Sequence, residues 1–69
     1  MATLKQLRLR ARLSYEALGK LADVSGKTVK RAEQGLPVQD VKAVAIVEAL
    51  GQALGMDLRV EDVEDLKIY

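Results

Sequence analysis

The segment 13–35 constrains the fold of this chain more than any other part of the sequence. It reads as a short helix, a three-residue corner and a second short helix that ends at Gly35. Ser14 is a residue type that caps helix starts, and apolar residues follow it at helical spacing. In the corner, residues 23–25, one apolar residue lies between two that favour turns, and Ser25 can cap the second helix. Two short helices joined at an angle are therefore predicted.

The second of these helices has very little to bury. Its only apolar residues, Val29 and Ala32, lie three positions apart and form a narrow edge. Most other positions are polar, basic or small: Gly26, Lys27, Thr28, Lys30, Arg31 and Gln34. A helix with a thin apolar edge and an outer face of hydrogen-bond donors is suited to a groove of DNA.

A first helix is predicted over residues 4–12. Leu4, Leu7 and Ala11 share one stripe of this helix, behind a capping Thr3. The three arginines that alternate along it cannot share one face, so at least one is free for solvent or phosphate.

The segment 38–54 is the most apolar part of the chain. A helix is predicted from residue 39 or 40, weakened or interrupted at Gly51 and ended by Gly55. Its apolar residues cover nearly the whole circumference, so the helix must be buried on more than one side. One side can meet the first three helices, and the other needs either the C-terminal segment or a second copy of the chain.

The tail, residues 56–69, has two interpretations. Val60, Val63 and Leu66 lie three apart among acidic residues, which favours a short amphipathic helix. Residues 57–60 and 66–69 alternate as strands do, and such strands could pair between subunits. We predict a single domain over residues 1–69, with the helix–corner–helix unit at 14–34 and the tail as a candidate dimerisation element.

Charge is divided unevenly along the chain. Residues 1–35 hold eight basic and three acidic side chains, whereas residues 36–69 hold three basic and seven acidic ones. This division indicates one face for a polyanion and another turned away from it.

The residue types exclude several classes of function. The chain has no cysteine and no histidine, which removes disulfides, thiolate chemistry, most zinc sites and the usual general base. No glycine-rich phosphate loop or metal-ligand cluster is present, so we expect no enzyme activity, no cofactor and no metal. No apolar stretch approaches the roughly 20 residues that span a bilayer, and we expect a cytoplasmic protein. With only two tyrosines as aromatic residues, the chain suits duplex DNA better than a single strand.

The sequence of the helix–corner–helix unit and its flanking residues resembles the Cro/repressor (XRE-type) helix-turn-helix family. The matching positions are Leu13, Ser14, Glu16, Leu18, Lys20, Leu21, Ala22, Val24, Ser25, Thr28, Val29, Glu33 and Gly35. The resemblance extends over residues 4–54 and implies an all-α, four- to five-helix bundle like that of lambda repressor. It also implies a homodimer that binds two operator half-sites about one helical turn apart.

The resemblance also implies roles for individual residues. Base-reading side chains fall at Gly26, Lys27, Thr28 and Arg31, with Arg31 as the first candidate for a guanine edge. Phosphate contacts are expected from Ser14, Tyr15, Lys30 and Gln34, and from Arg10 or Arg12. Arg8 and Glu33 match an ion pair that joins the first helix to the end of the recognition helix in similar repressors.

Three residues depart from the family pattern. Tyr15 stands where many relatives have a glutamine that contacts the DNA backbone. Gly19 replaces a small alanine, at a helix-propensity cost of about 1 kcal/mol. Asp23 replaces the glycine of the corner and brings negative charge towards the DNA.

The sequence thus predicts a sequence-specific, double-stranded DNA-binding transcriptional regulator that acts as a homodimer. Repression is favoured over activation, because 69 residues leave little surface to recruit polymerase. The alternative is a protein-interaction module with the same fold, an antitoxin or an adaptor, whose apolar helix 38–54 binds a partner. A protein partner would then contact residues 38–69.

Overall fold

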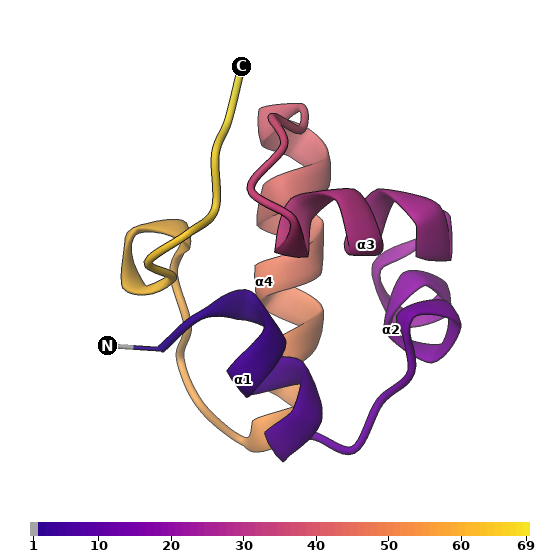
Figure 1. The fold of residues 1–69 in the computed structure, drawn as a ribbon. Coiled ribbons are helices and arrows are strands. Elements are labelled where there is room, and N and C mark those ends of the chain that lie inside the picture. Colours follow the sequence, from indigo (N-terminus) through magenta and orange to yellow (C-terminus); the bar gives the residue numbers. More distant parts are fainter. Residues whose placement is uncertain (1) are drawn as a thin grey trace.

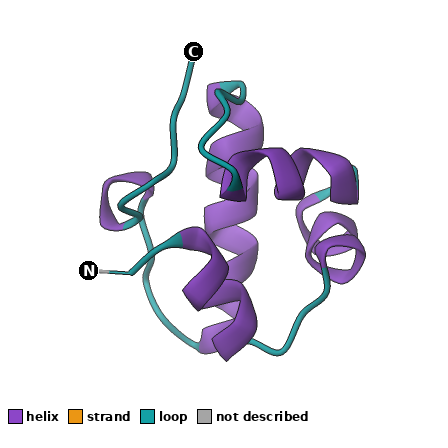
Figure 2. Ribbon diagram, viewed as in Figure 1, coloured by secondary structure: helices purple, strands orange, loops and turns teal. Residues whose placement is uncertain are grey.

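The computed structural model describes residues 2–69 and consists of four short to medium α-helices and one 3₁₀ turn. The elements are α1 (Leu4–Arg10), α2 (Tyr15–Ala22), α3 (Gly26–Glu33), α4 (Asp40–Leu54) and η1 (Val60–Asp62) (Figure 1). Figure 2 shows helices and loops, without a strand, over the described residues. The predicted all-α bundle is confirmed.

Polar side chains begin the first three helices. The Thr3 hydroxyl accepts a hydrogen bond from the Gln6 amide (3.2 Å), and the Gln6 side chain accepts one from the Thr3 amide (3.0 Å). Ser14 caps α2 and Ser25 caps α3 through bonds from amides three residues on. These bonds satisfy amide groups that have no partner within their own helix.

All four helices end in the same way, with one residue in the left-handed conformation. These residues are Arg12 (φ 59°), Asp23 (φ 58°), Gly35 (φ 79°) and Gly55 (φ 67°). The amide after each donates to a carbonyl five residues earlier: Leu13 to Arg8 (3.2 Å), Val24 to Gly19 (2.8 Å), Leu36 to Arg31 (3.1 Å) and Met56 to Gly51 (2.8 Å). These are the bonds of Schellman motifs, which stop a helix and turn the chain sharply.

The structure corrects two predictions about where helices end. The first helix ends at Arg10 rather than at residue 12, because Arg12 itself adopts the left-handed conformation. At Gly51 an interruption of the helix is wrong, since α4 continues through this residue to Leu54. A Cβ at Gly51 would lie 2.7 Å from the Met56 carbonyl oxygen, so this glycine permits the close return of the chain after Gly55.

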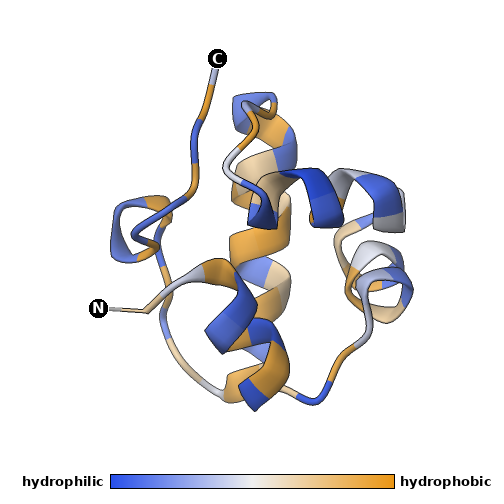
Figure 3. Ribbon diagram, viewed as in Figure 1, coloured by the Kyte–Doolittle hydropathy of each residue, from blue (hydrophilic) through white to orange (hydrophobic). Residues whose placement is uncertain are grey.

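The core forms around α4, which contacts α1, α2 and η1 (Figure 1). Figure 3 shows the contrast between a largely apolar α4 and a largely hydrophilic α3. The fully buried large side chains are Leu4, Leu18, Val29, Ile46, Val47 and Leu50. On the outer side of α4, Val41 and Val44 remain 75% and 42% exposed.

The tail matches neither interpretation in full. Only Val60–Asp62 is helical, as one 3₁₀ turn, and the residues around it make single parallel bridges within the chain. Ala2 pairs with Val63 and Val38 pairs with Ile68, so these residues pair with the chain's own N-terminal segment and α3–α4 connection. Because Val63 is buried, this arrangement covers part of α4 that the other helices leave open.

The left-handed residues predict a change in stability. Asp23→Gly should raise the free energy of unfolding by about 0.5–1 kcal/mol, because an L side chain is strained where glycine is not. Gly35→Ala, at φ 79° and with open space around its Cβ, is the matched reverse change and should lower stability by a similar amount. Urea unfolding followed by circular dichroism measures both variants. Equal midpoints for the two variants would contradict this account of the helix ends.

Candidate nucleic-acid interface

Helix α3 exposes most of its side chains and is held by its narrow apolar edge. Val29 and Ala32 are fully buried, whereas Lys27, Lys30 and Arg31 on the other faces are exposed, as is Gln34 just after the helix. Thr28 is half-buried, and its hydroxyl lies 2.9 Å from that of Ser25. Three cations and one hydroxyl group therefore lie along one short helix, and the Gln34 amide follows at its end.

Two glycines set how closely α2 and α3 approach each other. A Cβ at Gly19 would lie 2.6 Å from the Val24 carbonyl oxygen and 3.0 Å from the Gly26 amide nitrogen. A Cβ at Gly26 would lie 3.0–3.2 Å from atoms of Glu16. Gly26 thus has a packing role that the sequence did not reveal, and its base-reading role stays a prediction.

Arg8 joins α1 to the end of α3. Its guanidinium forms an ion pair with Glu33 through two hydrogen bonds, from Nε to Oε2 and from NH2 to Oε1 (3.2 Å). NH1 donates to the Leu13 carbonyl (2.9 Å), and the guanidinium carbon lies 4.3 Å from the centroid of the Tyr15 ring. The two partner side chains are only 9% and 5% exposed, so the pair is shielded from solvent.

The surroundings of Arg8 favour its charged form. Hydrogen bonding to the Glu33 carboxylate raises the pKa of Arg8 above its ordinary value and outweighs the opposing effect of burial. The arginine is therefore a permanent cation inside the bundle. Its charge is balanced by the Glu33 carboxylate and stabilised by a cation–π contact with the face of the Tyr15 ring.

A shallow hollow between α2 and α3 brings together four residues with predicted DNA contacts. It is lined by Tyr15, Glu16, Gly26, Lys27 and Lys30. The Tyr15 ring lies against Arg8, which fixes the ring in place. Glu16 adds a carboxylate beside the two lysines, a negative charge that the sequence pattern did not draw attention to.

The remaining predicted phosphate contacts are scattered. Ser14 is exposed at the start of α2, and Arg12 is exposed in the turn just before it. Arg10 shares a different hollow with residues that include Asp57 and Asp62, and none of its neighbours there belongs to α2 or α3. The structure therefore does not bring Arg10 together with the cations of α3.

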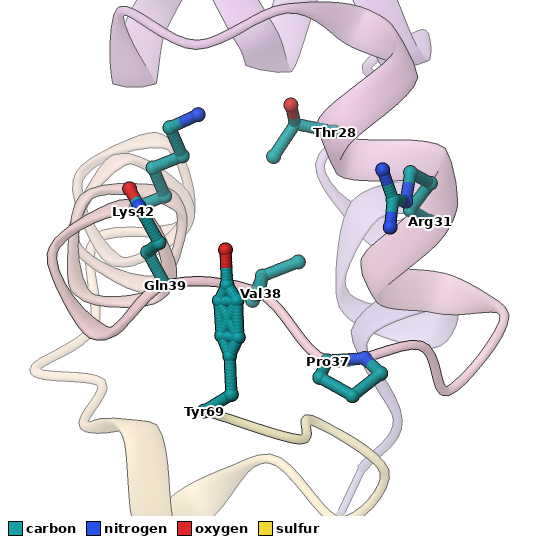
Figure 4. Close-up of a pocket in the computed structure, with 7 residues that line it drawn as sticks. All are labelled: Thr28, Arg31, Pro37, Val38, Gln39, Lys42 and Tyr69. Atoms are coloured by element: carbon teal, nitrogen blue, oxygen red, sulfur yellow. The ribbon is translucent and has the colours of Figure 1, made fainter.

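Another hollow lies between α3 and the start of α4, and five of its seven lining residues were absent from the sequence-based site, three of them polar. Thr28 and Arg31 line one side, and Gln39, Lys42 and Tyr69 line the others. Figure 4 shows the Tyr69 hydroxyl pointing between Lys42 and the side chains of α3. Lys42 is one of only three basic residues in the second half of the chain, and that was the available signal.

Metal-ligand groups and membrane-spanning helices are both absent from residues 2–69. Residues 2–69 contain no group of three or more acidic, histidine or cysteine side chains placed to hold a metal ion. Over the same residues, no helix has the length and apolar character needed to cross a membrane.

Removing one partner of the buried ion pair should destabilise the bundle. Arg8→Met leaves the Glu33 carboxylate buried without a partner, which should cost about 3–5 kcal/mol of unfolding free energy. The double variant Arg8→Met/Glu33→Leu should recover most of this loss, because it leaves no unpaired charge. Thermal and urea unfolding measure both. A single variant as stable as the parent, or a double variant no better than the single, would contradict the shielded pair.

Comparison with known proteins identifies the family of this fold. A family model described as a helix-turn-helix domain matches residues 2–66, nearly the whole chain. No curated protein and no solved structure matches significantly. Helices α2 and α3, with their corner at residues 23–25, are the two helices and the turn after which the family is named. The chain belongs to the helix-turn-helix domain family.

Proposed function

We propose that this protein is a sequence-specific regulator of transcription of the Cro/repressor (XRE) type. The observation that carries the proposal is α3, whose apolar edge is buried and whose cations Lys27, Lys30 and Arg31 are all exposed. A helix of this kind fits the major groove, where arginine and lysine read guanine edges. The match to a helix-turn-helix domain supports DNA as the partner.

The distribution of charge over the fold supports one DNA-facing side. Helix α4 stands between α2 and η1 in Figure 1, with η1 contacting α4. Five carboxylates lie in or beside η1: Asp57, Glu61, Asp62, Glu64 and Asp65. A polyanion would thus be attracted to the side of α3 and repelled from that of η1.

Individual roles follow from position and exposure. Lys27 and Arg31 read bases, Thr28 contacts a base edge, and the backbone at Gly26 approaches the groove. Phosphate contacts come from the exposed or half-buried donors Ser14, Tyr15, Lys30, Gln34 and Arg12. Arg10 is left out of this set, since it lies in the hollow with Asp57 and Asp62.

Repression is the mode of action that needs the fewest additional features. A protein that occupies an operator blocks polymerase by binding alone. Phosphate contacts position α3 on the duplex, and its side chains select the sequence. Such a regulator works where it meets DNA and polymerase, in the cytoplasm.

The proposed dimer forms through an apolar strip on the outer side of α4 and the tail. The strip consists of Val41, Val44 and Ile68, which are 75%, 42% and 43% exposed. Val41 and Val44 lie three residues apart on α4 and therefore share one face. Burial of these three side chains against the same strip of a second copy would pair two α3 helices on one duplex.

The alternative function, an antitoxin or adaptor, relies on the same strip. In that case Val41, Val44 and Ile68 would bind another protein, and the cations of α3 would have no nucleic-acid partner. The two functions differ in whether the protein binds DNA through α3.

DNA binding should depend on α3 and on salt. Lys27→Ala/Arg31→Ala should abolish selective binding, because each bidentate base contact contributes about 1–3 kcal/mol of discrimination. Affinity of the parent protein should fall steeply as salt rises, since phosphate contacts release counterions. Selection from a random duplex pool, followed by fluorescence anisotropy at several salt concentrations, measures both effects. Absence of binding to any duplex at low salt would refute the proposed function.

The dimer should depend on the apolar strip. Val41→Lys/Val44→Lys should reduce a species of twice 7.6 kDa to a monomer, because it places charge in the buried contact. Leu9→Lys, at an apolar residue of α1 that is 56% exposed, is the control and should leave the mass unchanged. Analytical ultracentrifugation measures the masses. A parent protein that stays monomeric at high concentration would contradict the dimer and favour a different protein partner for the strip.

A further inference from the structure

We infer that the hollow between α3 and the start of α4 holds a backbone phosphate of duplex DNA, and that Tyr69 is one of the groups that bind it. This inference rests on the proposed function. It adds a contact from the tail, which the sequence pattern gave no reason to place near DNA.

The first observation is the set of side chains around the hollow. Arg31 and Lys42 supply two cations from different helices, and Thr28, Gln39 and Tyr69 supply hydroxyl and amide groups (Figure 4). Pro37 and Val38 complete the lining, so none of the side chains around the hollow is a carboxylate. A concave site with two cations and several neutral donors attracts an oxyanion.

The second observation is the way the tail holds Tyr69. The Tyr69 amide donates to the Val38 carbonyl (3.1 Å), and the Val38 amide donates to the Lys67 carbonyl (3.0 Å). These two bonds fix the tail against the α3–α4 connection. Main-chain pairing therefore places the tyrosine. Burial of its side chain does not, because the residue is 70% exposed.

The third observation is that neighbouring tail residues serve different surfaces. Successive side chains of an extended segment point in opposite directions. Ile68 thus borders the groove along α4 with Val44 and Val47, whereas Tyr69 borders the hollow with Arg31 and Lys42. One short segment can then contribute both to the apolar strip and to the DNA-facing side.

The location of the hollow favours a DNA phosphate as its occupant. Arg31 lies on α3 and borders the hollow, so a duplex that receives α3 in its major groove brings its sugar–phosphate backbone close to Lys42 and Tyr69. Lysine, threonine, glutamine and tyrosine are all residue types that contact phosphates in protein–DNA complexes.

The test uses a random-sequence 20-base-pair duplex, since a phosphate contact carries no sequence information. Tyr69→Phe removes the hydroxyl and keeps the ring, and should lower affinity about three- to tenfold without changing the salt dependence. Lys42→Ala should lower affinity about tenfold and reduce the slope of log K against log salt by about 0.9, the value for one lost phosphate contact. Amide spectra of each variant check that the fold is retained.

Lys5→Ala is the matched control, because Lys5 is an exposed lysine of α1 that lines none of the hollows described above. It should leave both affinity and slope nearly unchanged. If Tyr69→Phe and Lys42→Ala also bind as the parent does, while Lys27→Ala/Arg31→Ala loses selective binding to the duplex chosen from the random pool, the inference fails and the proposed function stands. If the parent protein binds no duplex, both fail.

A second arm separates a DNA phosphate from a free one. Inorganic phosphate is titrated into the DNA-free protein, and the amide signals of Val38 and Tyr69 are followed. We expect no saturation below millimolar phosphate, because the hollow is shallow and open to solvent. Saturation in the micromolar range would assign the hollow to a free phosphate ligand and overturn the inference.

Discussion

The Arg8 guanidinium holds three parts of the bundle in register. It binds Glu33 at the end of α3, the Leu13 carbonyl between α1 and α2, and the ring of Tyr15 at the start of α2. Helix α3 has only Val29 and Ala32 to anchor it in the core, so its apolar contacts leave its far end weakly held. A shielded, bidentate ion pair at Glu33 supplies the missing constraint and gives the helix a defined direction. The exposed cations of α3 depend on this pair for their orientation.

Short helices in so small a chain need sharp and well-specified ends. Each helix here stops at one left-handed residue, followed by an amide that bonds back to the last turn. Two of these residues are glycines, whereas Arg12 and Asp23 adopt the conformation with a side chain. Asp23 therefore keeps the corner of the helix-turn-helix unit at a small cost in strain and adds a negative charge near the proposed DNA surface.

Much of the fold could be predicted from the sequence, because it depends on local signals. Thr3, Ser14 and Ser25 cap helices, Gly35 and Gly55 end them, and the apolar residues of segment 38–54 form the central helix. The pairing of Arg8 with Glu33 was implied only by the family resemblance, since a separation of 25 residues leaves no periodic signal. The candidate site was less accessible to sequence reasoning. The residues next to Gly26 in the sequence give no sign of its close contact with Glu16. The residues next to Tyr69 likewise give no sign that it lies beside α3.

The sequence by itself determined the helix-turn-helix unit, the all-α class and the face of α3 that carries donors. These follow from caps, apolar spacing and charge, which act over a few residues. Only the tertiary structure decided the course of the tail, the continuity of α4 through Gly51 and the neighbours of Arg10 and Lys42. The tail has too little apolar spacing to specify a helix or a strand alone. Its conformation is set by the uncovered side of α4 and by the free backbone groups of Ala2 and Val38, which are features of the folded bundle.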